Sequence, residues 1–346
     1  MTKLKRYVTR VVLFILLIPV LNLAAGPANA LDDEYSWDDK APICTQTSQI
    51  ALRACNSAER ESYLLSIGTC HNLLNENEKS DCLVISKRNL DYQLTLCNEK
   101  FKARNEVCTE LGEGAYNPQI IYHDFVKSFK SVLGNQYFPL KPGTLLTYRK
   151  VSPDGNESIL RDYFYVTNQE KKILGVTCRG VWTSTKTKDG ELKCSTLHWY
   201  AQDQESNVWS FGEVAQQFDQ KLLIGIGGSW DAGVNGAMPG ITMYADFKNH
   251  QEKAFRQQFF LGKVENIARI IGTVDELPLL KKNSKLPKTI HGPYLHVQEF
   301  SPLSPESLEI PINKFYALGV GLVLSVAPDG THTVLLSIGE RLAVRY

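Results

Sequence analysis

The sequence lacks the short motifs that would assign a catalytic, metal-binding or phosphate-binding site. The seven histidines include no His-Glu-x-x-His pair, so a catalytic zinc is not expected. The glycine-rich residues 225–228 are not followed by the lysine and the helix of a phosphate-binding loop. Asp231 stands where a serine nucleophile elbow around Ser229 would need its closing glycine. These absences favour a protein that is not an enzyme, and we expect neither a metal nor a cofactor.

Long apolar runs are also scarce, and the one near the N-terminus is too short for a membrane span. It covers residues 11–25, fewer than the roughly 20 residues that a span needs. Basic residues precede it and the small residues Ala28-Asn29-Ala30 follow it, which is typical of a secretory signal peptide. We expect residues 1–30 to be cleaved, so that the mature chain begins at Leu31 and does not span the membrane. The first cysteine is Cys44, too far from the cleavage point to accept a lipid.

An excess of basic residues is missing as well. The chain has 38 basic and 37 acidic residues, and removal of the four basic residues of the signal peptide leaves 34 against 37, a formal charge of −3. Proteins that bind nucleic acid through its phosphates need a basic surface, so we do not expect a nucleic-acid partner. The remaining residues, about 316, suffice for one large domain or two smaller ones.

What the sequence does contain is a symmetric cysteine series. Six of the eight cysteines lie in one proline-free stretch, separated by steps of 11, 15, 12, 15 and 11 residues. The series reads the same in both directions, so each cysteine has a counterpart at an equal distance from Glu76. The six are Cys44, Cys55, Cys70, Cys82, Cys97 and Cys108.

Helix geometry explains this spacing. At about 100° per residue, a step of 11 or 15 residues returns close to the same face of a helix. The intervening residues favour helix, and Gly112 and Gly114 would end the second arm. We predict a disulfide-stapled antiparallel helical hairpin over residues 42–111. The nested pairing that matches the symmetry is Cys44 with Cys108, Cys55 with Cys97, and Cys70 with Cys82.

Beyond the hairpin the apolar pattern changes twice. Ile121, Phe125, Phe129 and Val132 lie at helical spacing, which predicts a connecting amphipathic helix over residues 119–133. From Tyr137 onward the period is two, which is typical of strands. The expected strands cover residues 145–151, 160–167, 172–183, 192–201, 208–213, 254–261, 267–274, 294–300, 315–326 and 331–338.

These sequential strands predict an antiparallel β domain over residues 137–346, and hence an α+β protein. A meander that covers its own apolar face forms a barrel or half-barrel, and a sandwich is the alternative. Cys178 and Cys194 lie on neighbouring expected strands, and we expect them to pair in an oxidising compartment. A symmetric turn at Asp189-Gly190 would instead place Cys178 opposite Ala201, so the bond requires a longer or shifted loop.

Four blocks follow one another along this β domain. They are Tyr137-Phe-Pro-Leu-Lys-Pro-Gly143 with Tyr148, Trp199-Tyr-Ala-Gln-Asp203 with Asn207-Val-Trp209 and Phe211-Gly-Glu213, Gly228-Ser-Trp-Asp-Ala-Gly233 with Pro239-Gly-Ile241, and Gly319-Val-Gly-Leu-Val323. They resemble a family of uncharacterised secreted bacterial proteins over about residues 137–327. The resemblance implies an exported β-rich domain without an assigned activity. Leu318, in place of a proline, and His198, in place of an acidic residue, depart from the family pattern.

Two groups of side chains are candidates for a functional site. The aromatic group is either core or the lining of an apolar ligand site in a curved sheet. The acidic group is either a set of solvated loop carboxylates or the start of a glycosidase or calcium site, although no calcium-loop spacing is present. The aromatic group is Trp199, Tyr200, Trp209, Phe211 and Trp230, of which the three tryptophans are the predicted ligand site, and the acidic group is Asp203, Glu205, Glu213 and Asp219.

The sequence therefore favours an exported, non-enzymatic binding or interaction protein of the periplasm or the cell exterior. In this interpretation the helical hairpin is an interaction arm, and the β domain binds an apolar ligand or an envelope protein through the aromatic group. The alternatives are an envelope-directed hydrolase that uses the acidic group, and an inhibitor of a cell-wall enzyme.

Overall fold

A computed structural model describes residues 40, 42–129, 134–278 and 286–340, and the expected signal peptide lies outside these residues. The chain divides into two compact units, Met1–Lys40 and Ala41–Tyr346, and the second contains all the helices and strands discussed below. None of the helices in the described ranges is long and apolar enough to cross a membrane.

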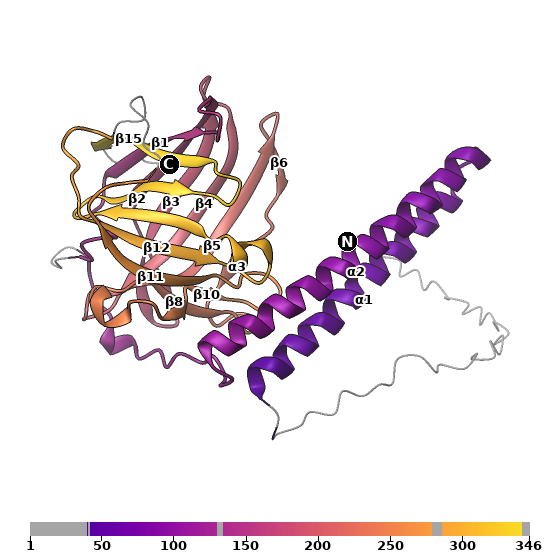
Figure 1. Cartoon of the computed structure of the whole chain (residues 1–346), viewed down its shortest axis with the longest axis horizontal. Helices are drawn as coiled ribbons and strands as arrows, with labels where there is room; N and C mark the ends of the chain where they lie inside the picture. Colours follow the sequence, from indigo (N-terminus) through magenta and orange to yellow (C-terminus); the bar gives the residue numbers. More distant parts are fainter. Residues whose placement is uncertain (1–39, 41, 130–133, 279–285, 341–346) are drawn as a thin grey trace, which may run out of the picture. The chain divides into compact units, whose positions relative to one another are not determined.

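The expected hairpin is present as two long antiparallel helices, α1 (Ile43–His71) and α2 (Glu76–Leu111) (Figure 1). The second begins where the Asn75 side chain accepts hydrogen bonds from the backbone N–H groups of Asn77 and Glu78. It ends at Gly112, which has a φ of 89° and donates its N–H to the Cys108 carbonyl. Helix capping thus sets both ends of α2.

Three disulfides join the two helices in the nested order that the symmetry predicted. Cys44 pairs with Cys108, Cys55 with Cys97, and Cys70 with Cys82, with Cα–Cα distances of 5.6, 5.8 and 5.6 Å. These distances are within the range that a disulfide requires, roughly 4.4–6.8 Å, and they fit an ordinary separation of the helix axes because each Cα lies about 2.3 Å from its axis. A hydrogen bond between the hydroxyls of Ser66 and Ser86 also joins the two helices.

The helix expected over residues 119–133 is wrong for its described part. Only a three-residue 3-10 helix, η1 (Tyr122–Asp124), forms there, and Phe125 then pairs with Asp203 in a β-bridge. Residues 130–133 lie outside the described ranges. The helical spacing misled because Phe125 is buried by tertiary contacts instead, edge-on to the rings of Trp209 and Phe211.

The β domain is one antiparallel sheet of fifteen strands in the described residues, curved into a nearly closed barrel shape (Figure 1). Thirteen strands follow one path, and β6 and β7 pair with β5 beside it. The barrel expectation is therefore confirmed over the sandwich. The path runs β10-β8-β5-β4-β3-β2-β1-β15-β14-β13-β12-β11-β9. The strands are β1 (Thr144–Val151), β2 (Glu157–Ile173), β3 (Val176–Thr187), β4 (Leu192–Gln202), β5 (Val208–Asp219), β6 (Leu222–Gly225), β7 (Trp230–Asp231), β8 (Met238–Met243), β9 (Ala254–Arg256), β10 (Gln258–Phe259), β11 (Ile267–Val274), β12 (Tyr294–Phe300), β13 (Ile312–Ala317), β14 (Gly321–Val326) and β15 (His332–Glu340).

The two edges of the sheet meet because consecutive residues form both of them. β9 and β10 lie at opposite ends of the path and are separated only by Gln257, whose side chain donates to the Thr242 carbonyl and to Glu299. Gly240 makes the approach possible, since a Cβ there would lie 2.4 Å from the Arg256 carbonyl oxygen. Closure of the barrel-shaped sheet thus depends on a glycine at this seam.

Residues 135–140 cover one end of the barrel-shaped sheet. The Asn135 side chain donates to the Met243 carbonyl at the end of β8, and the Gly319 N–H donates to the Gln136 carbonyl from the β13–β14 turn. Because β8 and β13 are far apart in the strand order, the segment crosses the barrel end. Tyr137 and Leu140 insert into the interior core from it.

Four further expectations need correction. The strand expected over residues 172–183 instead contains the turn between β2 and β3, and the strand expected over residues 254–261 is divided into β9 and β10. The single strand expected over residues 315–326 is two strands, because the chain turns at Gly319, which has a φ of 72°. Cys178 and Cys194 do not pair and are both free thiols. The β3–β4 register pairs Arg179 with Tyr200 and Thr185 with Cys194, so seven residues, about 23 Å of strand, separate the two cysteines along the sheet.

Candidate functional site: a cavity inside the barrel

The barrel-shaped sheet encloses a cavity of about 420 Å³ next to the segment that covers its end. This volume is within the range of small-molecule sites, roughly 300–1,000 Å³. The lining comes from residues 138–139 and from strands β1, β2, β3, β4, β13, β14 and β15, so side chains of seven strands converge on it. Period-two alternation of strands explains this convergence, since every second side chain of a barrel strand faces the interior.

The inner end of the cavity is aromatic and buried. Phe138, from the covering segment, makes edge-on contacts with the rings of Tyr200 and Phe164 at centroid distances of 5.1 and 5.9 Å. Tyr148 and Tyr316 complete this end and are 4% and 3% exposed. An apolar group that entered this end would be surrounded by rings, which bury large areas with little loss of conformational freedom.

The three tyrosines of the inner end are neutral hydrogen-bond donors. Burial raises the pKa of Tyr148, Tyr200 and Tyr316 well above the ordinary value, and nearby carboxylates act in the same direction. Tyr148 donates its hydroxyl hydrogen to the Leu322 carbonyl at 3.0 Å. The inner end therefore carries no charge at physiological pH.

The outer end of the cavity is polar and half-buried, in contrast to the inner end. Asp162 lies 3.3 Å from the Lys150 ammonium and accepts a 2.6 Å hydrogen bond from Thr185. Lys314 forms an ion pair with Glu299. The half-buried residues Cys194, Ser325 and Thr333 also line this end. Polarity and exposure thus rise together along the cavity, which is the pattern of a mouth.

A polar series crosses three strands on one wall. His198 Nε2 lies 3.0 Å from the Thr183 hydroxyl, and His198 Nδ1 lies 3.0 Å from a carboxylate oxygen of Glu213. His198 and Thr183 line the cavity, and the His198 ring stacks on Tyr200 at a centroid distance of 5.8 Å. The series brings hydrogen-bonding groups between the aromatic end and the charged mouth.

The tryptophans predicted as a ligand site lie elsewhere. Trp199 and Trp230 are 7% and 6% exposed and pack in a core cluster with Phe125, Cys178 and Phe211. Trp209 packs against the same cluster, and its indole N–H donates to Asp203 at 2.8 Å. The cavity lining contains none of the three.

The acidic group does not converge on one site. Asp203 and Glu205 lie in the β4–β5 turn, where both contact the Asn207 side chain. Asp219 ends β5, so the twelve-residue strand separates it from them. Only Glu213 lies beside the cavity, through His198.

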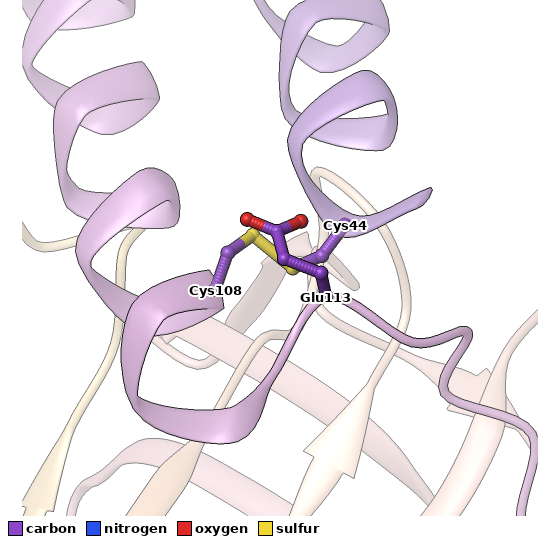
Figure 2. Close-up of side chains that lie close together, drawn as sticks. All are labelled: Cys44, Cys108 and Glu113. Atoms are coloured by element: carbon purple, nitrogen blue, oxygen red, sulfur yellow. A yellow bond between two sulfur atoms is a disulfide. The ribbon is translucent and has the colours of Figure 1, made fainter. Parts of the chain in front are cut away.

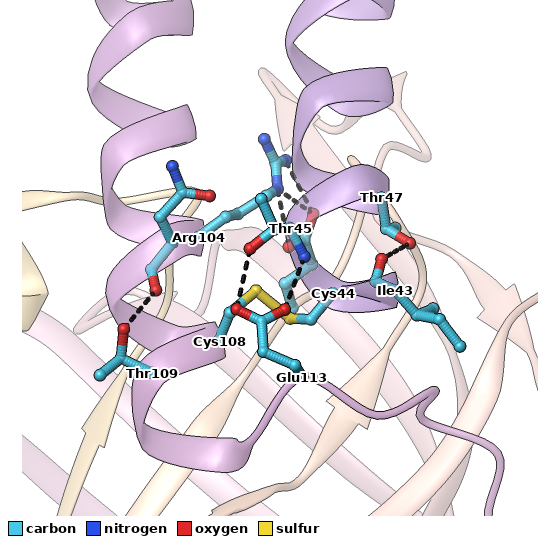
Figure 3. The surroundings of a disulfide bond; sticks show 10 residues. Ile43, Cys44, Thr45, Thr47, Arg104, Cys108, Thr109 and Glu113 are labelled. Atoms are coloured by element: carbon cyan, nitrogen blue, oxygen red, sulfur yellow. Dashed lines mark hydrogen bonds and ion pairs between the residues drawn. A yellow bond between two sulfur atoms is a disulfide. The ribbon is translucent and has the colours of Figure 1, made fainter. Parts of the chain in front are cut away.

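One group with metal-ligand chemistry occurs at the base of the hairpin in the described residues, formed by Cys44, Cys108 and Glu113 (Figure 2). Both sulfur atoms are already joined in a disulfide, which leaves a single carboxylate as a ligand. The Glu113 carboxylate instead accepts hydrogen bonds from the backbone N–H and the hydroxyl of Thr45 (Figure 3). Its position is explained by capping of the α1 N-terminus.

Sequence reasoning missed most of the cavity lining. Tyr200 was named as a member of the aromatic group, and it lines the cavity. Tyr148 was noted only as a member of a resembling block, and Lys314 and Tyr316 were not singled out. The available signal was the polar or aromatic residue at every second position of an expected strand, as in His198 and Tyr200 on β4. That signal alone does not tell which face becomes the interior.

No protein-family model and no curated protein matches the chain. Two solved structures match it in part. One, from Bacteroides fragilis and described as an exported protein with a YmcC-like fold, is 10% identical with a TM-score of 0.28, and the match covers 60% of this chain and 100% of that chain. The other, a lipoprotein by its description, from Parabacteroides distasonis, is 12% identical with a TM-score of 0.27, covering 60% of this chain and 99% of that chain. TM-scores this low do not establish a shared fold or function. The resemblance of the four blocks to a family of secreted proteins therefore stays a prediction.

Proposed function

We propose that the protein is a non-enzymatic binding protein that holds a small amphipathic molecule inside the barrel-shaped sheet. The observation that carries this proposal is the polarity gradient of the cavity, from the buried rings of Tyr148, Tyr200 and Tyr316 to the half-buried polar mouth at Asp162 and Lys314. A molecule with an apolar tail and a polar head matches that gradient in one orientation only. Binding would remove the tail from water, which is the main source of affinity in such sites.

The pairing of charges at the mouth indicates the kind of head group. The Asp162 carboxylate faces Lys150, and the Glu299 carboxylate faces Lys314. A head with a net charge would have to displace one partner and leave its counterpart half-buried and unpaired, which is costly. We therefore propose an uncharged or zwitterionic head that forms hydrogen bonds, with Thr183, His198 and Thr185 available as partners.

The cellular setting supports carriage of such a molecule outside the cytoplasm. Three disulfides in one hairpin are typical of a chain that folds in an oxidising compartment. Together with the expected signal peptide, they support a location in the periplasm or the cell exterior. The envelope is a source of amphipathic molecules for a binding protein located there.

One observation favours a hydrolase as a second candidate. Thr183, His198 and Glu213 stand in the order of a nucleophile, a base and a carboxylate. However, Thr183 lies on β3, which is paired on both sides by β2 and β4, so the backbone N–H groups around it are committed to the sheet and form no oxyanion hole. We therefore propose that Thr183, His198 and Glu213 orient the ligand through hydrogen bonds. Hydrolysis of a lauroyl ester by the wild type, lost in Thr183→Val, would reverse this assignment.

Calorimetric titration with three dodecyl-chain probes tests the proposal. The probes are monolauroyl glycerol, laurate and dodecylamine, which share the tail and differ in the charge of the head. We expect saturable binding of monolauroyl glycerol to the wild-type protein, with the two charged probes at least tenfold weaker, about 1.4 kcal/mol. Absence of binding by all three probes would contradict the proposal.

A pair of Thr→Phe variants locates the binding. Thr333 lines the cavity mouth, so Thr333→Phe fills it and should weaken binding at least tenfold. Thr147 is also half-buried, but it alternates with the cavity residues Leu146 and Tyr148 and so lies on the other face of β1. Thr147→Phe is thus the matched control, expected within twofold of wild type. Equal binding by the two variants would place the ligand outside the cavity.

A further inference from the structure

A second pocket lies outside the barrel interior, where the chain leaves α2 and meets the seam of the sheet. It has a volume of about 400 Å³ and is lined by residues 111–112, 114–116 and 118 and by side chains of β5, β8 and β9 with Tyr244. Four aromatic residues line it: Tyr116, Trp209, Tyr244 and Phe255. It shares no lining residue with the cavity described above.

The charged group of this pocket is Arg256 on β9. Its guanidinium lies over the rings of Phe259 and Tyr116, at 4.6 and 5.4 Å from their centroids. Within the described residues its Nη1 is buried without a hydrogen-bond partner, and Arg256 forms no ion pair. Burial lowers the pKa of Arg256 from its ordinary value, as expected for a cation that has lost part of its hydration.

The carboxylate whose charge acts on Arg256, that of Glu265, already has another hydrogen-bond partner. Glu265 is 2% exposed and is held by Arg104 through two short hydrogen bonds, from Nε at 2.9 Å and from Nη2 at 2.8 Å. It also accepts the Gly262 N–H at 2.7 Å. The Tyr116 hydroxyl donates to the Pro239 carbonyl, so it is committed as well. Arg256 is left as a cation in an aromatic pocket with an unused donor.

We propose that this pocket binds a small organic anion with an apolar, planar body. Its carboxylate or phosphate group would accept hydrogen bonds from Arg256, and its body would lie among Trp209, Tyr244 and Phe255. An anion supplies the acceptor that the guanidinium lacks, and a fork of N–H donors suits both carboxylate and phosphate oxygens. Aromatic walls favour a flat apolar body over a hydrated inorganic ion.

Ligand-observed NMR on the full chain tests this proposal with benzoate, phenyl phosphate, benzyl alcohol and inorganic phosphate. We expect saturable binding of benzoate, phenyl phosphate or both, with benzyl alcohol and inorganic phosphate at least tenfold weaker. Preference between the two aromatic anions identifies the acceptor group. Binding of benzyl alcohol as tight as that of the anions, or no binding of either aromatic anion, would overturn the proposal.

Two arginine variants provide the matched comparison. Arg256→Gln should weaken binding of the aromatic anion about tenfold, since a hydrogen bond to a charged group is lost. Arg269→Gln is the control, because Arg269 also lies over a ring, that of Phe300, but pairs with Glu110. It should bind within twofold of wild type. If Arg256→Gln does not fold, the comparison of benzoate with benzyl alcohol on the wild-type protein still tests whether the pocket requires an anion.

Independence from the interior cavity is tested with the cavity variant. Thr333→Phe should leave benzoate and phenyl phosphate binding unchanged, because Thr333 lines only the first cavity. If Thr333→Phe abolishes binding of the anions, they occupy the interior and the second site is refuted. If Thr333→Phe loses binding of monolauroyl glycerol but keeps binding of the anions, the two ligands occupy separate sites.

Discussion

At the scale of single residues, a buried ion pair joins the hairpin to the sheet. Arg104 on α2 is 6% exposed, and it holds Glu265 through two of its nitrogens. The surrounding contact is apolar, with Val107 packed on Ile267 and Phe300. Removal of one charge would therefore leave the other in a site that water does not reach.

We predict that Arg104→Met destabilises the protein by about 3–5 kcal/mol, the usual cost of an unpaired buried charge. Urea denaturation measures this loss. The double variant Arg104→Met with Glu265→Leu should recover most of it, because both charges are gone. Arg269→Met, which breaks the more exposed pair with Glu110, should cost less than about 1 kcal/mol. A loss as small for Arg104→Met would contradict this description of the contact.

The two free cysteines should differ sharply in reactivity. Burial raises the pKa of the Cys178 thiol to about 12, so at pH 8 its thiolate is about one part in ten thousand. Cys194 is partly exposed at the cavity mouth. Iodoacetamide should therefore alkylate Cys194 alone in the folded protein, and both cysteines after unfolding without reduction, as read by mass spectrometry. An unfolded protein that accepts no alkyl group would show a fourth disulfide.

Residue contacts were predicted correctly from the spacing of cysteines along helices, and wrongly where the contact depends on the register of two strands. The six cysteines of the hairpin were paired correctly from their spacing. The pairing of Cys178 with Cys194 was wrong, because the β3–β4 register pairs Arg179, the neighbour of Cys178, with Tyr200 and places Cys194 opposite Thr185. In a sheet, neighbouring strands are not sufficient for contact, since the turn sets which residues face each other.

At the scale of elements, the disulfides should contribute unequally. Cys44–Cys108 closes a loop with a sequence separation of 64, and Cys70–Cys82 one of 12. Cys55–Cys97 remains in both variants and shortens the loop that Cys44–Cys108 closes to two segments with separations of 11 residues each. Because the entropy lost by the unfolded chain grows with the logarithm of loop length, the difference is about 0.5 kcal/mol. We predict that Cys44→Ser with Cys108→Ser lowers the free energy of unfolding by that much more than Cys70→Ser with Cys82→Ser. Equal losses in urea denaturation would contradict a chain-entropy origin.

Helices and strands were also predicted correctly where local sequence determines them, and wrongly where tertiary contacts do. The hairpin was predictable because helix propensity, symmetry and terminal glycines agree within one stretch of chain. The connecting helix was not, because Phe125 and Phe129 pack on different core clusters of the sheet, which an extended chain reaches. Strands β6, β7 and β8 were missed, as they are short or interrupted by Gly and Pro.

At the scale of the whole molecule, the sequence predicted a curved antiparallel sheet but not what its interior contains. The cavity exists because seven strands and the segment at 138–139 place alternate side chains around one space. Which of the two faces of each strand turns inward depends on the strand register across the whole sheet, which is a property of distant segments. For this reason the tryptophans were predicted as the site, whereas Tyr200 was only one member of the aromatic group and Tyr148 and Tyr316 did not belong to it.

If the cavity is a binding site, the reactivity of the Cys194 thiol reports whether the cavity is occupied, because Cys194 lines its mouth. The measurement is the rate at which iodoacetamide alkylates Cys194 while monolauroyl glycerol is titrated, with glutathione in the same mixtures as the control for the reagent. We expect a saturable fall of at least tenfold in the alkylation rate of Cys194, because a bound ligand covers the cavity mouth where this thiol lies. An alkylation rate that stays constant across the titration would contradict it.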